Sequence, residues 1–97
     1  MDESWPFDQP RNCATITVWT ILNGEASILM VSHDTDDHGW QFLDGWPFET
    51  SRAALVSLKT IVELDPTVQE VADLPPGWTA TRERVGAAWK RWPPDKR

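Results

Sequence analysis

Two histidines and three aspartates lie within six residues, in the segment His-Asp-Thr-Asp-Asp-His at 33–38. Carboxylate and imidazole groups bind metals and act as general acids and bases. The order matches the first positions of a calcium-binding loop, but the twelfth, where a bidentate Glu belongs, is Gly45. Zinc needs three or four converging ligands, and the single Cys and two His of this chain supply few such ligands. We therefore expect no metal site, and a solvated turn whose Asp side chains accept local hydrogen bonds.

Catalytic patterns are absent from the sequence as well. We find no nucleophile motif and no Gly-rich phosphate loop, and nothing indicates a buried pair of carboxylates with split pKa values. A nucleophilic Cys13 would need a base that the sequence does not place, so we expect a small, buried hydrophobic residue there, near the start of a strand. The sequence predicts no catalytic residue, no cofactor and no enzymatic activity.

Length and composition limit the architecture. The chain has 97 residues, 40% of them hydrophobic and 25% charged, and we expect one domain with an extended arm (1–12), a folded body (13–92) and a frayed tail (93–97). No apolar run is long enough to span a membrane. The first residues lack the features of a signal peptide, and a single Cys agrees with a reducing compartment, so we expect a cytoplasmic protein that does not act at membranes.

The charges are distributed unevenly. Thirteen acidic and three basic residues precede position 77, whereas two acidic and six basic residues follow from there on. The acidic part would repel phosphates, which argues against a nucleic-acid partner. We expect the basic C-terminal segment to lie on the acidic body, although a docking segment remains the alternative.

The residue pattern predicts an α+β fold, with a small antiparallel sheet packed by one main helix and a shorter second helix. Residues 14–22 and 25–32 are predicted to pair as a hairpin around an Asn23-Gly24 turn, which would place Val18 opposite Leu29. Further strands are predicted at 40–43 and 78–84, and residues 86–92 are expected to form a helical turn or irregular structure.

The main helix is predicted over 51–64, because its apolar residues fall in one arc at helical spacing. Asp65-Pro66 should end it and begin the second helix, since Asp is a good cap and Pro suits the first helical position.

Seven tryptophans provide candidates for both core and contact surface. We expect Trp19, Trp40 and Trp78 to be mainly structural. Partial exposure is expected for Trp46, Trp89 and Trp92, which could anchor a partner because Trp dominates binding hot spots. The candidate partner-binding residues are Asp34, Asp36, Asp37, Trp40, Trp46, Trp89 and Trp92.

The order of segments over residues 13–45 resembles the bacterial immunity-protein-33-like family, once classed only as a domain of unknown function. The resemblance is carried by Ser32-His33-Asp34, the acidic loop, and the run Gly-Trp-Gln-Phe-Leu-Asp-Gly at 39–45. Residues 74–78 and 82–89 are similar to the closing part of that family. Where family patterns have Asp-Ser-Gly-Trp, this chain has His38 in place of Ser. The resemblance implies a protein that neutralises a toxin by binding it, without catalytic residues.

Together these observations predict a non-enzymatic protein-binding module with a basic partner, such as a toxin. One alternative is a small-ligand or metal-binding module that uses the loop at 33–38. Another is self-association as a homodimer through a sheet face formed by Trp19, Ile21, Ile28 and Met30.

Overall fold

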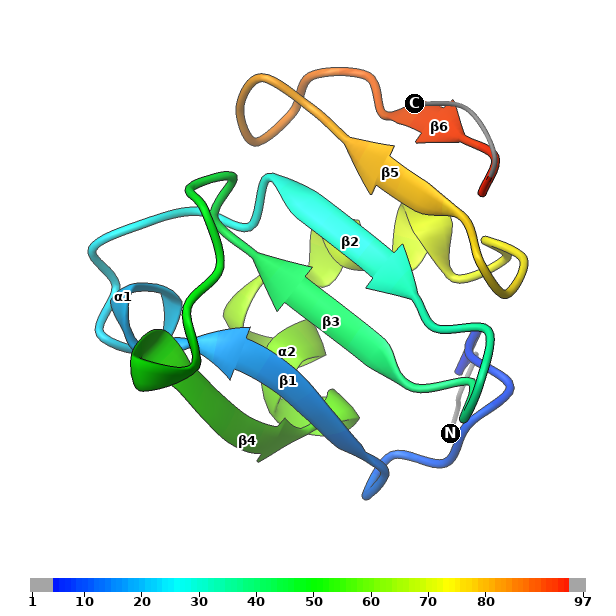
Figure 1. The fold of residues 1–97 in the computed structure, drawn as a ribbon, viewed down its shortest axis with the longest axis horizontal. Coiled ribbons are helices and arrows are strands. Elements are labelled where there is room, and N and C mark those ends of the chain that lie inside the picture. Colours follow the sequence, from blue (N-terminus) through cyan, green and yellow to red (C-terminus); the bar gives the residue numbers. More distant parts are fainter. Residues whose placement is uncertain (1–4, 95–97) are drawn as a thin grey trace.

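Six short strands form one mixed sheet in the computed structural model, which describes residues 5–94 (Figure 1). They are β1 (Ala14–Val18), β2 (Met30–His33), β3 (Trp40–Leu43), β4 (Ala53–Ser57), β5 (Thr79–Thr81) and β6 (Lys90–Trp92). Their order in the sheet is β4-β1-β3-β2-β5-β6. The pair β1–β3 is parallel and the other pairs are antiparallel. The predicted α+β class is confirmed.

Four short helices accompany the sheet: α1 (Trp19–Leu22), η1 (Thr50–Arg52), α2 (Leu58–Leu64) and η2 (Pro66–Val71). The two longer ones, α2 and η2, lie behind the sheet in the view of Figure 1. The Ser57 hydroxyl accepts a hydrogen bond from the Thr60 amide and begins α2. Asp65 caps η2 in the same way and Pro66 takes its first position, which confirms the predicted boundary at Asp65-Pro66.

The core lies between the sheet and these two helices. The register pairs Val31 with Phe42, both fully buried, so they share one sheet face. Against them pack apolar residues of α2 and η2 and of the segment after η2, namely Leu58, Ile61, Val68, Val71 and Leu74. Burial of this apolar surface supplies the main favourable term for folding.

The predicted N-terminal hairpin is wrong. Residues from Trp19 to Leu22 form the helical turn α1, and Asn23 has φ −82°, whereas a type I′ turn needs positive φ at both central positions. Amides of Asn23 and Gly24 donate to the carbonyls of Trp19 and Ile21, so this turn continues helical bonding. As a result β3 lies between β1 and β2, and Val18 does not pair with Leu29. The proposed self-association face does not exist as such, because Ile21 and Ile28 are buried in the core.

The helix predicted over 51–64 is correct only in its second half. Residues 53–57 form β4, which pairs along its whole length with β1 at one edge of the sheet. Ala54 is buried whereas Leu55 is 72% exposed, so the two do not share one apolar face. Five consecutive strand pairs to β1 outweigh a weak helical periodicity here.

The basic C-terminal segment lies against the acidic body, as predicted. Arg91 donates to Asp73 at 3.0 Å, and the Trp89 indole donates to Glu70 at 3.1 Å. The strand predicted at 78–84 is confirmed as the shorter β5, but residues 90–92 form β6 instead of a helical turn.

The predicted arm is anchored where it is described. Phe7 is buried and packs edge-on against Trp40, with ring centroids 5.2 Å apart. Residues 1–4 of the arm and 95–97 of the predicted tail lie outside the described residues.

Arg82 joins the sheet to the helical layer through a fully buried side chain. Its guanidinium donates twice to the Ile28 carbonyl, at 3.1 and 2.9 Å, and once to Asp65 at 2.7 Å. A further hydrogen bond reaches the Thr67 hydroxyl at 2.8 Å, and the Trp89 ring lies 4.2 Å from the guanidinium carbon. All three donor nitrogens therefore have partners, as burial of this charge requires.

Replacing Arg82 with Ala should lower the free energy of unfolding by about 3–5 kcal/mol, because the carboxylate of Asp65 and the carbonyl of Ile28 lose their donors. Denaturant unfolding followed by tryptophan fluorescence measures this. Arg84→Ala is the matched control, since its exposed side chain contacts only the neighbouring Glu83 among the described residues. We expect the control to change stability by less than about 0.5 kcal/mol; equal effects for both variants would contradict the assignment.

Candidate protein-binding surface

The three aspartates of the acidic loop form a tight turn between β2 and β3. Asp34 accepts a hydrogen bond from the Asp36 amide at 3.0 Å, and Asp37 accepts one from the Gly39 amide at 2.8 Å. These are the local hydrogen bonds that the sequence predicted. Within residues 5–94, no three His, Cys, Asp or Glu side chains are placed to hold a metal ion.

Trp40 follows this turn, but its side chain belongs to the core. It is 2% exposed and stacks on His33, with ring centroids 4.0 Å apart. Its indole N–H donates to the Gln9 side chain at 2.7 Å, which satisfies the one polar atom of the ring. Trp40 therefore supports the turn from inside and does not present a surface to a partner in this conformation.

Trp89 and Trp92 lie at the sheet edge formed by β6. Trp89 comes directly before this strand, and Trp92 is its last residue. Trp89 is half-buried, held between the Arg82 guanidinium and Glu70. Trp92 is 45% exposed, and its indole N–H donates to the Thr81 hydroxyl at 3.0 Å. Both side chains are thus tied to the fold, and only Trp92 offers much free surface.

Trp46 is 72% exposed and lies in the connection between β3 and η1, away from the other predicted residues. The predicted site residues thus fall into separate places: the β2–β3 turn with Trp40, the β5–β6 edge, and Trp46 alone. The structure does not bring them into one surface.

Two further aromatic residues are exposed in the region of Trp46. Phe48, 45% exposed, belongs to the same connection, and Trp19, 54% exposed, opens α1. Figure 1 shows α1 and this connection at the same end of the sheet. We call Trp19, Trp46 and Phe48 the aromatic patch. The expectation that Trp19 is mainly structural is wrong, because its side chain on α1 is 54% exposed. The exposure of Trp46 and Phe48 could be expected from the sequence, because both lie in the bulky loop Trp46-Pro47-Phe48.

A partly buried ion pair connects the two segments that carry the aromatic patch. Asp44, whose side chain is 2% exposed, contacts the guanidinium of Arg52. Asp44 also accepts hydrogen bonds from the Thr20 hydroxyl at 2.8 Å and the Trp46 amide at 3.1 Å. Arg52 donates in addition to the Pro47 carbonyl at 3.1 Å. The network thus links α1 to both ends of the connection that carries Trp46 and Phe48.

The pKa of Asp44 reflects these contacts. Burial raises it, but hydrogen bonds from Thr20, the Trp46 amide and Arg52, together with the charge of Arg52, outweigh burial and lower the pKa below its ordinary value of 3.8. The carboxylate is therefore ionised at neutral pH and acts as a structural acceptor. This is a positioning role rather than that of an acid catalyst.

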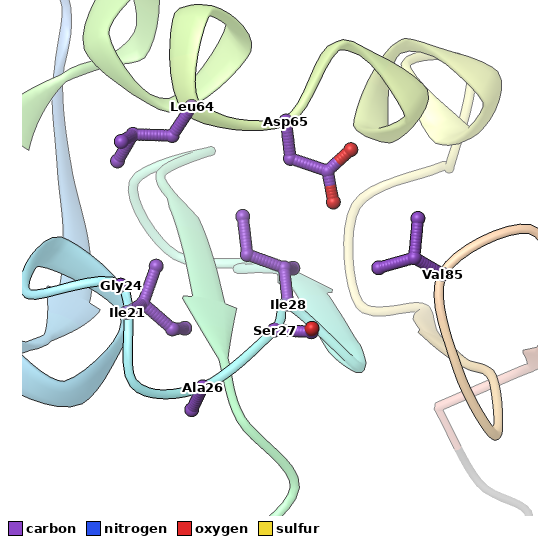
Figure 2. A pocket seen from close by; sticks show the side chains of 8 residues that line it. All are labelled: Ile21, Gly24, Ala26, Ser27, Ile28, Leu64, Asp65 and Val85. Carbon is purple, nitrogen blue, oxygen red and sulfur yellow. The ribbon is translucent and has the colours of Figure 1, made fainter.

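A pocket of about 250 Å³ lies beside the end of α2 (Figure 2). Its lining is mostly apolar, with Ile21 and Ile28 from the core and the more exposed Leu64 and Val85. Asp65, its one charged residue, is already bound by Arg82 and Thr67. The one charged group of the pocket is therefore engaged within the fold and is not free to bind a ligand.

No protein-family model, curated protein or solved structure matches this chain. Among the described residues, no helix is both long enough and apolar enough to cross a membrane.

Replacing Asp44 with Asn should lower the free energy of unfolding by about 2–3 kcal/mol at pH 7, because a hydrogen-bonded buried charge is lost. Since folding lowers the pKa of Asp44, its contribution is complete above the unfolded value and disappears as pH falls through the folded one. The difference between wild type and Asp44→Asn should therefore shrink below about pH 4. Denaturant unfolding between pH 2.5 and 7 measures it.

Asp36→Asn is the matched control, since this exposed side chain makes no hydrogen bond to any described residue. We expect it to be nearly neutral at every pH. A pH-independent loss in Asp44→Asn would contradict an ionised, stabilising carboxylate.

Proposed function

We propose that the protein is a non-enzymatic binding module whose aromatic patch anchors a basic protein partner. The observation that carries the proposal is the exposure of Trp19, Trp46 and Phe48 on segments tied down by the Asp44–Arg52 ion pair. Large exposed aromatic side chains are uncommon on a protein surface and are enriched among residues that dominate binding energy.

The anchoring of the patch favours tight binding. A loop that must become ordered on association loses conformational entropy, which reduces affinity. Here the backbone at Trp46 and at Pro47 is already fixed by Asp44 and Arg52. The side chains that would enter a partner therefore start from a defined position, and less free energy is lost on binding.

The charge of the chain favours a basic partner. Its net charge is −6, and two of the arginines near the C-terminus are engaged within the fold, Arg82 with Asp65 and Arg91 with Asp73. A negative surface accelerates encounters with positively charged proteins and repels phosphate backbones. This supports a basic protein over a nucleic acid.

The sequence resemblance to immunity-protein-33-like domains supports a more specific form of the proposal. In that form the partner is a toxin, and the protein neutralises it in the cytoplasm by covering a functional surface. A basic toxin that acts on nucleic acid would suit the negative charge of this chain. Self-association through the aromatic patch is the competing outcome.

Affinity capture from the lysate of the source organism tests the proposal, using wild type beside a variant with Trp46→Ala and Phe48→Ala. We expect one stoichiometric basic protein with wild type and its loss with the variant. With the purified partner, the dissociation constant should rise at least thirtyfold for the variant, as for a binding hot spot. Added salt should slow association more than it changes dissociation.

Leu64→Ala is the matched control, because Leu64 is a comparably exposed apolar residue of α2, outside the patch. It should retain full binding. Equal capture by wild type and the aromatic variant would reject the patch as the anchor. A dimer that dissociates in the aromatic variant would favour self-association.

A further inference from the structure

The His33 side chain contains a buried nitrogen without a partner. Its Nδ1 lies 2.6 Å from the Leu74 carbonyl oxygen. A carbonyl can only accept, so Nδ1 carries the proton in this hydrogen bond, and Nε2 of the neutral ring presents a lone pair. Nε2 is buried and has no hydrogen-bond partner among the described residues, although an unsatisfied polar atom of this kind is costly.

His33 lines a cavity of about 530 Å³ between the N-terminal arm, the β2–β3 turn and the segment after η2. Three prolines contribute apolar, rigid walls: Pro6, Pro75 and Pro76. Two carboxylates, Asp8 and Asp73, complete the polar lining together with Gln9 and His38, and no Lys or Arg lines the cavity. Arg91 already binds Asp73, whereas Asp8 makes no ion pair with any described residue.

We propose that this cavity binds an organic cation with N–H donors on an aliphatic stem, an alkylammonium group. The cation would donate one hydrogen bond to His33 Nε2 and pair with the Asp8 carboxylate. Its methylene stem would pack against the prolines, as lysine stems pack on apolar surface. The cavity thus offers acceptors and negative charge to a ligand that supplies donors and positive charge.

The walls of the cavity are held in fixed positions. Gln9 connects the arm to both sides, since it accepts from the Trp40 indole at 2.7 Å and donates to the His38 carbonyl at 3.2 Å. His33 is held by its stacking on Trp40. His38 has φ 57°, a left-handed conformation that is uncommon for a residue with a side chain and is often found at binding sites.

Access to Nε2 requires a small side-chain movement, because the atom is covered. His38 lines the same cavity with an exposed ring, whose centroid lies 6.3 Å from that of His33. A free amine and a lysine side chain of another protein share the chemistry proposed, and the experiment below distinguishes them. The cavity lies at the opposite end of β3 from the aromatic patch, so the inference goes beyond the proposed function and does not depend on it.

The experiment is a titration of the ¹⁵N-labelled full chain at pH 8 with n-butylammonium, following the ring nitrogens of His33 by NMR. We expect a saturable shift of Nε2 with a dissociation constant of about 1 mM, within the efficiency limits of very small ligands. Butyltrimethylammonium keeps the charge and stem but lacks N–H donors, and should bind at least tenfold more weakly. Nα-acetyl-lysine amide distinguishes the sources: tighter binding than butylammonium indicates a protein side chain, and equal or weaker binding indicates a free amine.

Two variants test the acceptors. Asp8→Asn should weaken butylammonium binding at least tenfold, whereas Asp36→Asn, on the adjacent turn, should leave it unchanged. His33→Asn keeps a donor for the Leu74 carbonyl and removes Nε2, so it should abolish binding. If this variant does not fold, the result for Asp8→Asn decides whether the cavity binds the cation. No saturable shift up to 100 mM, equal binding of the trimethylated analogue, or a shift of both His33 and His38 with Zn²⁺ alone at micromolar concentration would overturn the inference.

Discussion

The buried guanidinium of Arg82 connects parts of the chain that would otherwise have little to hold them together. It reaches Ile28, 54 residues away, and Asp65 at the junction of α2 and η2. Apart from Arg82, β5 and β6 are held to the rest by three residues of pairing between β5 and β2 and by the contacts of Trp89 and Arg91 with Glu70 and Asp73. A charge in this position is costly unless it is paired and hydrogen-bonded, and here each of the three guanidinium nitrogens donates at least one hydrogen bond. The same contact aligns Trp89 and draws the basic C-terminal segment over the acidic body.

The other buried polar groups are also paired with a charge or a hydrogen-bond partner, with one exception. Asp44 and Arg52 neutralise one another beside the aromatic patch, and Thr17 donates to the Phe42 carbonyl at 2.7 Å within the sheet. His33 is the exception, because one of its nitrogens is satisfied and the other is not. Since every other buried side-chain nitrogen and oxygen within residues 5–94 has a hydrogen-bond partner, this exception is where a ligand is best sought.

Elements whose determinants are local could be predicted from the sequence. Asp65-Pro66 carries both a cap and the proline of a first helical turn, and Trp40–Leu43 is a strand bounded by turn residues; both were found as expected. Elements whose structure depends on distant pairing could not. The segment 53–57 is a strand because it pairs with β1, and the sequence of these five residues does not by itself predict that pairing. The Asn23-Gly24 signal failed for a related reason, since Ile21 buries its side chain in the core through a helical turn.

In the candidate sites, too, features set by neighbouring residues could be predicted and features set by distant contacts could not. The exposure of Trp46 could be expected from its bulky, proline-containing loop, whereas that of Trp19 depended on α1. The local hydrogen bonds of Asp34 and Asp37 are typical of Asp in turns, and they were predicted. The unpartnered Nε2 of His33 could not be, because its tautomer is set by a carbonyl 41 residues further along the chain.

The pairing of β1 has a consequence for synthesis on the ribosome. Of the six strands β1 is synthesised before the others, but its neighbours are β3 and β4, and Thr15 bonds to Val56 across 41 residues of sequence. Both edges of β1 therefore remain unpaired until β3 and β4 have been synthesised. Topologies dominated by such distant contacts fold slowly, because a long loop must close before any stabilising contact forms. Until these partners have been synthesised, the open edges of β1 are accessible to chaperones and to unwanted strand pairing.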